Sequence, residues 1–274
     1  MDWFHPAEIL KTDLLLSMNN NINSCPILLI NLNQSTGRLL EAQKKLTLAG
    51  VNFERIEAVD GRLLNADDLN GITEWDKNKF FKPLSAGEIG CFLSHIAAVE
   101  RIVSEGWPMA VVLEDDFELH ADFNNLLSKI VNSGDSFPDL IKLEGILAGG
   151  DIVKKITKDL NLVRHRRPPV RTVAQLWTLE GAKKFLAIAH PLRRPVDVQL
   201  KHWWEGDLNI LTAVPALVTQ DTKQSTTSTI GARHPVGLTG KIRQYIYRFN
   251  YAFLCQWQLF RRYGWRSWWR ANRG

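Results

Sequence analysis

Three consecutive carboxylates, Glu114, Asp115 and Asp116, are the residues whose type and position most clearly suggest chemistry. They follow an uncharged apolar run at 109–113, which is typical of a strand covered on both faces of a sheet. Open α/β sheets bind their ligands at the carboxyl ends of such strands. Carboxylates this close repel one another unless they are compensated, and a hard divalent cation is the simplest compensation. The triplet therefore predicts a Mn²⁺ or Mg²⁺ site that attracts phosphate oxygens, as in a nucleotide-dependent transferase.

The elements that must position this triplet begin with a βαβ unit. Residues 26–32 read as a strand, 34–49 as a helix ended by Gly50, and 53–58 as a second strand. No glycine-rich phosphate loop of the Rossmann or P-loop type follows the first strand, so a bound nucleotide would be held in another way. The pattern predicts an α/β fold with a mostly parallel central sheet flanked by helices.

The segment 85–105 is predicted to be a helix that begins with a capping box of Ser85 and Glu88. One face carries an apolar stripe, and the opposite face carries small or polar residues: Gly87, Gly90, Cys91, Ser94 and His95. This second face either allows another element to approach closely, with His95 as a structural histidine, or it places Ser94 and His95 against the site after the triplet. The sequence leaves both interpretations open.

The sequence then continues with alternating elements. We expect a helix at 123–131, strands at 140–143 and 172–179, a helix at 180–189, a helix at 198–204, and a strand at 210–218 broken by a proline. Lys142 and Glu144 fall at the end of the first of these strands, and Asp197 is expected to be the N-cap of the last helix. Residues 220–230 are expected to form a Ser/Thr-rich loop, and its tip, Ser225 to Thr229, is a candidate to close over a bound donor.

Length and composition favour one substantial domain with extensions. The chain has 274 residues, of which 45% are hydrophobic. We expect an amphipathic extension and linker at 1–25, a catalytic domain at 26–235 and a basic aromatic tail at 236–274. Cys25, Cys91 and Cys255 are widely spaced and odd in number, which favours a reducing compartment over a disulfide framework. A cleaved signal peptide is not expected, because acidic residues interrupt the first apolar stretch.

The net charge of +5 comes from the tail. Residues 241–274 hold eight of the 34 Lys and Arg and none of the 29 Asp and Glu, so the remainder carries 26 − 29, or −3. The tail is predicted to form a helix whose apolar side is Ile242, Tyr245, Ile246, Phe249, Phe253, Trp257 and Phe260. Its uncharged run at 249–260 spans about 18 Å as a helix, whereas a bilayer core is about 30 Å thick.

Because the tail cannot cross a membrane, its basic and aromatic residues predict a helix that lies on an anionic membrane surface. The alternatives are a helix packed on the protein and an oligomer contact. A lipid-linked acceptor would lie on the same surface, which predicts a cytoplasmic protein at the inner face of the cytoplasmic membrane. No nucleic-acid partner is expected, because the basic charge is confined to the tail.

Several segments, taken together and in order, resemble glycosyltransferase family 25, the group of bacterial lipooligosaccharide galactosyltransferases and their relatives. The specific matches are Ile30-Asn31-Leu32 with Arg38, Ala58-Val59-Asp60-Gly61-Arg62, Ser85 to Cys91 with Ser94-His95, Val112 to Asp116, Ile141 to Glu144, and Glu180 to Lys184. Weaker matches continue through Pro195-Val196-Asp197 and Pro215 to Gln220. The chain departs from the family before Glu180, where Leu176 and Trp177 stand in place of the usual tyrosine. The resemblance covers roughly residues 26–230.

The resemblance implies a GT-A type fold and an inverting transfer of a hexose, by family galactose, from a UDP-sugar to a lipooligosaccharide or lipopolysaccharide acceptor. It places Asn31, Leu32, Arg38, Asp60, Gly61 and Arg62 around the uridine and ribose, and His95 and Lys142 near the diphosphate. Ser94 is a further candidate donor-binding residue. Asp116 is the first choice as metal ligand. Glu114 is the second candidate for the metal, and either Glu114 or Asp115 would hold the ribose or a metal-bound water.

An inverting transfer also needs a base for the acceptor hydroxyl. Asp197 is the first candidate, with a plain helix cap as its alternative, and Glu144 is the second candidate. Two rival functions remain at this stage. One is a non-enzymatic nucleic-acid or membrane-binding module acting through the tail, which would explain the charge but not the triplet. The other is a metal-dependent phosphotransferase that uses the same carboxylates.

Overall fold

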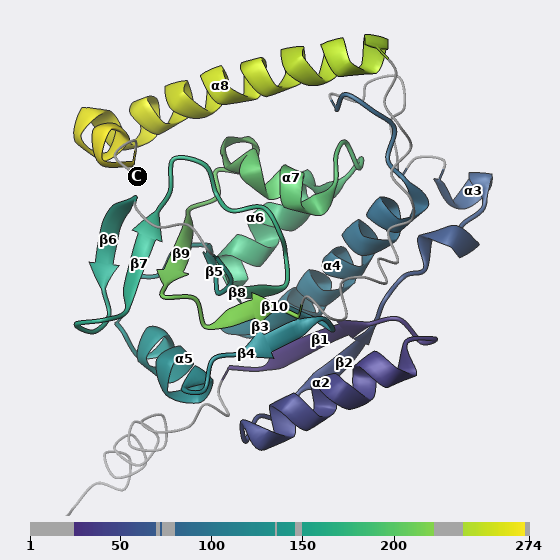
Figure 1. The fold of residues 1–274 in the computed structure, drawn as a ribbon, viewed down its shortest axis with the longest axis vertical. Helices are drawn as coiled ribbons and strands as arrows, with labels where there is room; N and C mark the ends of the chain where they lie inside the picture. Colours follow the sequence, from purple (N-terminus) through teal and green to yellow (C-terminus); the bar gives the residue numbers. More distant parts are fainter. Residues whose placement is uncertain are drawn as a thin grey trace, which may run out of the picture.

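The computed structural model describes residues 25–69, 72, 80–134, 136–145, 150–221 and 238–271. Its centre is an eight-stranded sheet in the order β2-β1-β3-β8-β5-β9-β7-β6 (Figure 1). The strands are β1 (Ile27–Asn31), β2 (Glu54–Glu57), β3 (Met109–Glu114), β5 (Leu140–Lys142), β6 (Asp151–Lys155), β7 (Asn161–Arg164), β8 (Ala174–Thr178) and β9 (Ile210–Val214). A separate antiparallel ribbon joins β4 (Phe117–Leu119) to β10 (Val218–Gln220).

The direction of the strands confirms the predicted α/β sheet. Strand β1 is parallel to both β2 and β3, and β5 is parallel to β9. Strand β8 runs antiparallel between β3 and β5, so β1, β3 and β5 all point the same way. Only β7 and β8 run against the common direction of the other six strands. The carboxyl ends of β1, β3 and β5 therefore lie at one edge of the sheet, where a ligand is expected.

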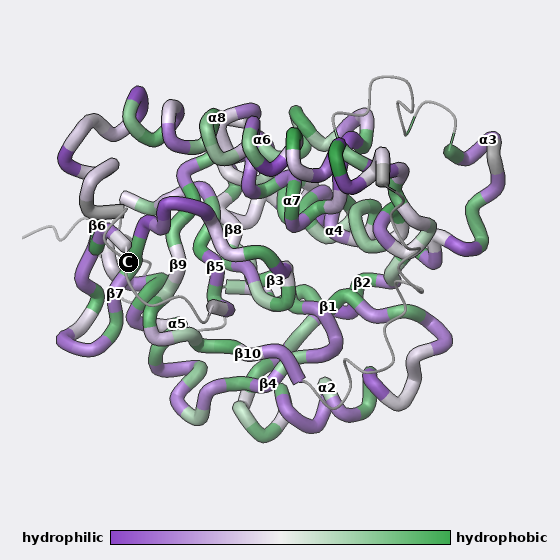
Figure 2. Tube along the Cα trace, turned by 45° about the horizontal axis from the view of Figure 1, so that its top comes forward, coloured by the Kyte–Doolittle hydropathy of each residue, from purple (hydrophilic) through white to green (hydrophobic). Residues whose placement is uncertain are grey.

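Helices cover both faces of the sheet. Alternate residues of β1 divide between the two cores: Leu28 and Ile30 belong to one, and Ile27 and Leu29 to the other. The first core is covered by α4 (Ala86–Glu105), α6 (Leu179–Ala189) and α7 (Val196–Lys201), and the second by α2 (Thr36–Leu48) and α5 (Phe123–Val131) (Figure 1). Hydrophilic and hydrophobic segments alternate along α2 (Figure 2), as expected for a helix with one buried face.

Helix α4 confirms the predicted capping box. Ser85 accepts a hydrogen bond from the Glu88 amide, the Glu88 carboxylate accepts one from the Ser85 amide, and Gly106 ends the helix at φ 64°. The small face of α4 packs against the short 3₁₀ helix η2 (Gly61–Leu63). A Cβ added at Gly90 would lie 2.4 Å from the Val59 carbonyl oxygen, so close approach requires glycine there.

Other boundaries differ from the sequence-based expectation. Strands β6 and β7 were not expected, and the strand predicted at 210–218 divides at Pro215 into β9 and β10. The N-cap of α7 is Pro195 and not Asp197, which lies in the first turn, so that prediction was wrong. The remaining short elements are α3 (Ala66–Leu69) and η3 (Trp203–Glu205). The predicted extension at 1–25, apart from its last residue, and the loop tip at 225–229 fall outside the described residues.

The tail forms the long helix α8 (Leu238–Ala271), which kinks at Gly264 and lies across the outer side of α6 and α7 (Figure 1). Its inner side buries Tyr251, Cys255 and Leu259 in the same core as α4 and α6. The predicted apolar side stays exposed: Ile242, Tyr245, Ile246, Phe249, Phe253, Trp257 and Phe260. Within the described residues, no helix is long and apolar enough to cross a bilayer. The helix thus packs on the protein and also presents an apolar face to solvent.

Candidate active site

Three strands bring predicted site residues to one edge of the sheet. Asn31 ends β1, Glu114 ends β3, and Lys142 ends β5, and these strands point the same way. Strand β8, which runs in the reverse direction, begins beside them. Val173, just before β8, accepts a hydrogen bond from the Glu114 amide at 2.9 Å. The side chains of the acidic triplet leave this edge in three different directions, and each has its own partners.

Asp115 points toward the βαβ opening. It accepts hydrogen bonds from Asn31 Nδ2 at 2.7 Å and from Arg38 Nη1 at 3.2 Å. Burial raises the pKa of Asp115, and these two donors counteract part of that effect. Arg55, on β2, donates to Asn31 Oδ1 at 3.2 Å and so fixes the orientation of the amide. Asn31, Arg38 and Asp115 thus form the polar cluster that the family resemblance places at the uridine and ribose.

A second polar cluster lies at η2, next to the βαβ opening. Asp60 accepts hydrogen bonds from its neighbour Arg62 at 2.8 and 2.6 Å and from Gln34 at 2.7 Å. The hydrogen bonds from Arg62 lower the pKa of Asp60, so it stays ionised. The buried Ser94 hydroxyl accepts from the Val59 amide at 2.8 Å and donates to the Gly90 carbonyl oxygen at 2.7 Å. Ser94 therefore positions the Asp60–Arg62 turn on α4.

Asp116 occupies the turn between β3 and β4 and is only 8% exposed. Its Oδ2 accepts a hydrogen bond from Gln220 Nε2 at 2.8 Å, whereas its buried Oδ1 has no hydrogen-bond partner. Burial, with the negative charge of Glu114 next in size, raises the pKa of Asp116 to about 6. A buried carboxylate oxygen without a donor, next to other acids, is a donor atom suited to a hard divalent cation.

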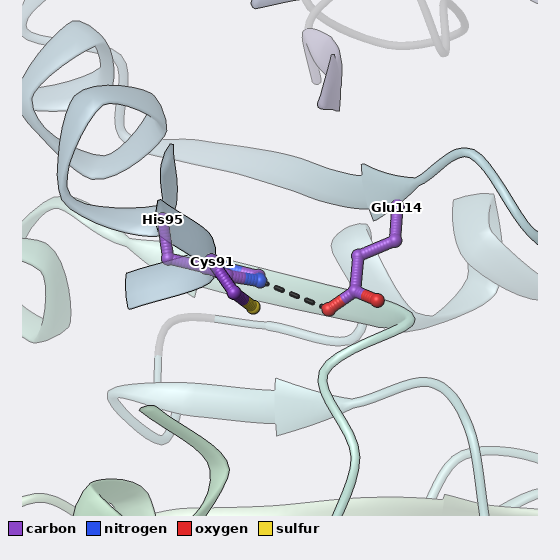
Figure 3. Close-up of side chains that lie close together, drawn as sticks. All are labelled: Cys91, His95 and Glu114. Atoms are coloured by element: carbon purple, nitrogen blue, oxygen red, sulfur yellow. Dashed lines mark hydrogen bonds and ion pairs between the residues drawn. The ribbon is translucent and has the colours of Figure 1, made fainter. Parts of the chain in front are cut away.

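Glu114 turns toward α4 (Figure 3). Its Oε1 lies 3.0 Å from His95 Nε2 and also accepts a hydrogen bond from the Thr172 hydroxyl. Burial alone would raise the pKa of Glu114, but the hydrogen bond and charge of His95 together hold it below its usual value. Cys91, one helical turn before His95, points to the same place (Figure 3). Burial raises the pKa of the Cys91 thiol strongly, and the surrounding carboxylates add to the effect.

Lys142 and Glu144 form an ion pair inside the protein. The lysine is 0% exposed and the glutamate 3%, and Lys142 Nζ lies 3.1 Å from Glu144 Oε1. Lys142 also donates to the carbonyl oxygens of Pro169, at 2.9 Å, and of Arg171. Glu144 accepts from the Ala174 amide at 3.1 Å, and burial raises its pKa. In this arrangement the pair joins β5 to the segment before β8, and a contact between Lys142 and a diphosphate stays a prediction.

Asp197 is half-buried in the first turn of α7, where its own carboxylate accepts a hydrogen bond from the Val198 amide at 2.8 Å. Burial raises the pKa of Asp197, and the charge of Lys142 lowers it in part. The charges of Asp197 and Glu114 act on each other and on the Cys91 thiol. The charge of Asp197 thus interacts with that of Glu114, whereas the Glu144 carboxylate is buried and paired with Lys142.

The structure adds four residues that sequence analysis did not connect to the site. Arg55 orients Asn31, Thr172 bonds Glu114, Gln220 bonds Asp116, and Cys91 faces His95 and Glu114. Thr172 and Gln220 come from segments 58 and 104 residues away from their partners. No local pattern could have linked them. Leu32, the remaining predicted donor contact, follows β1 and is partly exposed.

The fold and the site are those of an α/β protein with an acidic ligand-binding edge. An α/β sheet without a glycine-rich loop after its first strand carries an acidic triplet at its carboxyl edge, and an asparagine and an arginine bind the middle carboxylate of the triplet. The family model for glycosyltransferase family 25 (LPS biosynthesis protein) matches residues 24–200. The chain belongs to glycosyltransferase family 25.

Curated proteins that are similar to this chain support the same family assignment. The chain is 30% identical over 185 residues to the "Probable inactive glycosyltransferase 25 family member 3" of Bos taurus, covering 59% of this chain and 31% of that protein. It is 27% identical over 218 residues to human "Procollagen galactosyltransferase 2", covering 70% and 34%, and 25% identical over 215 residues to "Procollagen galactosyltransferase 1" of Danio rerio, covering 70% and 35%. The chain thus spans about a third of the length of these animal relatives.

Proposed function

We propose that this protein is an active, metal-dependent, inverting hexosyltransferase that uses a UDP-sugar, with galactose as the first candidate. The observation that carries the proposal is the buried Asp116 Oδ1, which has no partner and lies at the carboxyl edge of the sheet beside the Asn31, Arg38 and Asp115 cluster. The relatives named as galactosyltransferases support the choice of sugar. Relatives named as inactive make the test of activity essential.

In the proposed donor site, one group of residues binds the metal and another binds the nucleoside. Asp116, with Glu114 as second candidate, would hold Mn²⁺ or Mg²⁺, and the bound cation would stabilise negative charge on the departing diphosphate. Asn31, Arg38, Asp115 and the Asp60–Arg62 turn would bind the uridine and ribose. Stabilisation of the leaving group acts mainly on charge that grows in the transition state, so it contributes to kcat more than to donor affinity.

The test of the proposed function is calorimetric titration of UDP-galactose, UDP-glucose and their N-acetyl counterparts, each with and without Mn²⁺. We expect one of the four to bind in a metal-dependent manner and to release UDP slowly by hydrolysis when no acceptor is present. Binding of UDP alone with no preference among the sugars would favour the metal-dependent phosphotransferase instead. If no nucleotide binds to the folded protein, the transferase proposal is wrong.

Asp197 is our candidate for the general base. Its pKa is raised by burial, and it is half-buried in the first turn of α7, whereas Glu144 is enclosed with Lys142. We expect Asp197→Asn to lower kcat by on the order of 10²- to 10⁴-fold. The Kd for the UDP-sugar should change by less than about threefold, since a base acts on the acceptor. Glu180→Gln, at an exposed acid in the first turn of α6, is the matched control.

We further propose that the acceptor is a lipid-linked saccharide and that α8 binds the membrane that carries it. Phe249 and Phe253 are 74% and 65% exposed on the outer side of the helix. Residues 241–274 contain eight basic and no acidic residues, so the charge of this segment complements an anionic leaflet. The inner side of the helix is fixed to the body by Ser267, which donates to Asp151 at 2.7 Å, and by Arg262, which pairs with Asp207 at 2.9 Å.

Vesicle sedimentation tests this membrane contact. The protein should bind vesicles containing phosphatidylglycerol and should bind pure phosphatidylcholine vesicles weakly, and binding should fall as salt rises. The variant Phe249→Ser/Phe253→Ser should lose roughly 100-fold in partition coefficient, because two phenylalanine side chains no longer insert. Leu48→Ser, at an 89% exposed leucine on α2, is the matched control. Equal loss in both variants would contradict a role for α8, and the predicted location at the cytoplasmic face stays a prediction.

A further inference from the structure

The side chains of Cys91, His95 and Glu114 converge at the boundary between α4 and β3 (Figure 3). Cys91 and His95 are four residues apart in one helix, so both face the same side. Glu114 approaches them from the end of β3, which lies beneath α4 in the fold. The potential ligand atoms of the three side chains all lie within 4.8 Å of one another.

We propose that Cys91, His95 and Glu114 form a three-ligand site for Zn²⁺ or a similar borderline-soft divalent cation. One thiolate, one imidazole nitrogen and one carboxylate oxygen are a ligand set that zinc accepts, with a fourth position left for water. This site takes Glu114 as its carboxylate, so the proposed Mn²⁺ or Mg²⁺ ion would be held at Asp116 without Glu114. A thiolate and an imidazole select against those hard cations. The proposal does not depend on the transferase activity.

The separations between the three ligand atoms need only small changes to fit a zinc ion. Zinc bonds of about 2.0–2.3 Å at tetrahedral angles separate neighbouring ligand atoms by about 3.3–3.7 Å. His95 Nε2 and Glu114 Oε1 are 3.0 Å apart, and no pair in the cluster is separated by more than 4.8 Å. Rotation about the Cys91 and Glu114 side-chain bonds is the movement that would bring the three atoms around one ion. A helical i, i+4 pair with a carboxylate from another element is a common arrangement for zinc.

The environment of the cluster also favours a cation. Four carboxylates, those of Glu114, Asp197, Asp116 and Glu88, act electrostatically on the Cys91 thiol. His95 is 1% exposed, and its Nδ1 has no hydrogen-bond partner. A cation bound here would replace the hydrogen bond between His95 Nε2 and Glu114 Oε1.

Cobalt titration of the full chain tests the proposal. After dialysis against a chelator, Co²⁺ should bind with one-to-one stoichiometry and give a near-ultraviolet sulfur-to-metal absorption band that Zn²⁺ abolishes and Mn²⁺ does not. Cys91→Ser should remove the band. His95→Gln should weaken Co²⁺ binding about tenfold or more, in line with the usual loss when a zinc site is disturbed. Cys255→Ser, at a buried thiol that donates to the Arg166 carbonyl oxygen, should leave the band unchanged.

Two further measurements keep the result interpretable. The urea midpoints of Cys91→Ser and His95→Gln, measured without metal, show whether each variant is folded. Asp116→Asn should retain the cobalt band while losing Mn²⁺-dependent donor binding, which separates the two metal sites. The proposal is overturned if wild-type protein gives no sulfur-to-cobalt band, or if the band survives in folded Cys91→Ser.

Discussion

Asp116→Asn should abolish Mn²⁺-dependent binding of the UDP-sugar and should also make the metal-free protein more stable at neutral pH. The Asp116 side chain is 8% exposed, and burial and the Glu114 charge raise its pKa to about 6 from an ordinary value of 3.8. The folded state therefore binds this proton more tightly than the unfolded state. The protonated carboxyl group therefore contributes to the free energy of unfolding. This contribution is fully present below about pH 4 and is lost as pH rises through about 6.

The size of this loss of stability follows from the size of the shift in the Asp116 pKa. A rise of about two pKa units corresponds to about 3 kcal/mol of unfolding free energy lost between pH 4 and pH 7. Asparagine keeps an acceptor for Gln220 and carries no charge, so the variant should gain up to about 3 kcal/mol at pH 7 and little at pH 5 or below. Urea unfolding with chelator present, at intervals from pH 5 to pH 8, measures the difference.

The control for this substitution is Asp159→Asn, at a carboxylate that is 78% exposed beside Lys158. It should change neither donor binding nor the pH dependence of stability, because an exposed charge keeps its hydration. Donor binding by wild type should itself weaken as pH falls below about 6, since a metal ligand must be deprotonated. If Asp116→Asn binds donor and Mn²⁺ like wild type, Asp116 is not the metal ligand.

Lys142→Met should be among the most destabilising single substitutions in the chain. It would leave the Glu144 carboxylate, 3% exposed, without the opposing charge that now lies 3.1 Å away. Removal of one partner from a buried ion pair typically costs about 3–5 kcal/mol, because the remaining charge stays dehydrated. The Pro169 and Arg171 carbonyl oxygens would lose their donor as well. Urea unfolding at pH 7 should show this loss as a lower midpoint with an unchanged slope.

The double variant Lys142→Met/Glu144→Gln should recover most of the lost stability, since no unpaired charge remains. Lys183→Met, at the exposed pair with Glu180, is the matched control and should cost less than about 1 kcal/mol. The double variant also separates the two roles predicted for Lys142. If the lysine contacts the diphosphate, the stable double variant still loses donor affinity. Full recovery of donor binding would show that Lys142 acts only by holding β5 to the segment before β8.

The sequence by itself determined the features that depend on neighbours in the chain. The capping box at Ser85 and Glu88, the strand before Glu114 and the helix at 123–131 all follow from local periodicity and local hydrogen bonding, and the structure contains each of them. The apolar side of the tail helix was also predicted correctly, because helical geometry alone sets which residues share a face. The position of the triplet at a strand end was a local property as well.

Only the tertiary structure decided how the three carboxylates differ. They are adjacent in sequence, yet Asp115 meets Asn31 and Arg38, Glu114 meets His95 and Thr172, and Asp116 meets Gln220. Their pKa values therefore shift in different directions or by different amounts. The same holds for Lys142 and Glu144, whose burial together depends on β8 and β9 closing around β5. Burial and partner identity come from segments far apart in the chain, so local sequence patterns do not contain them.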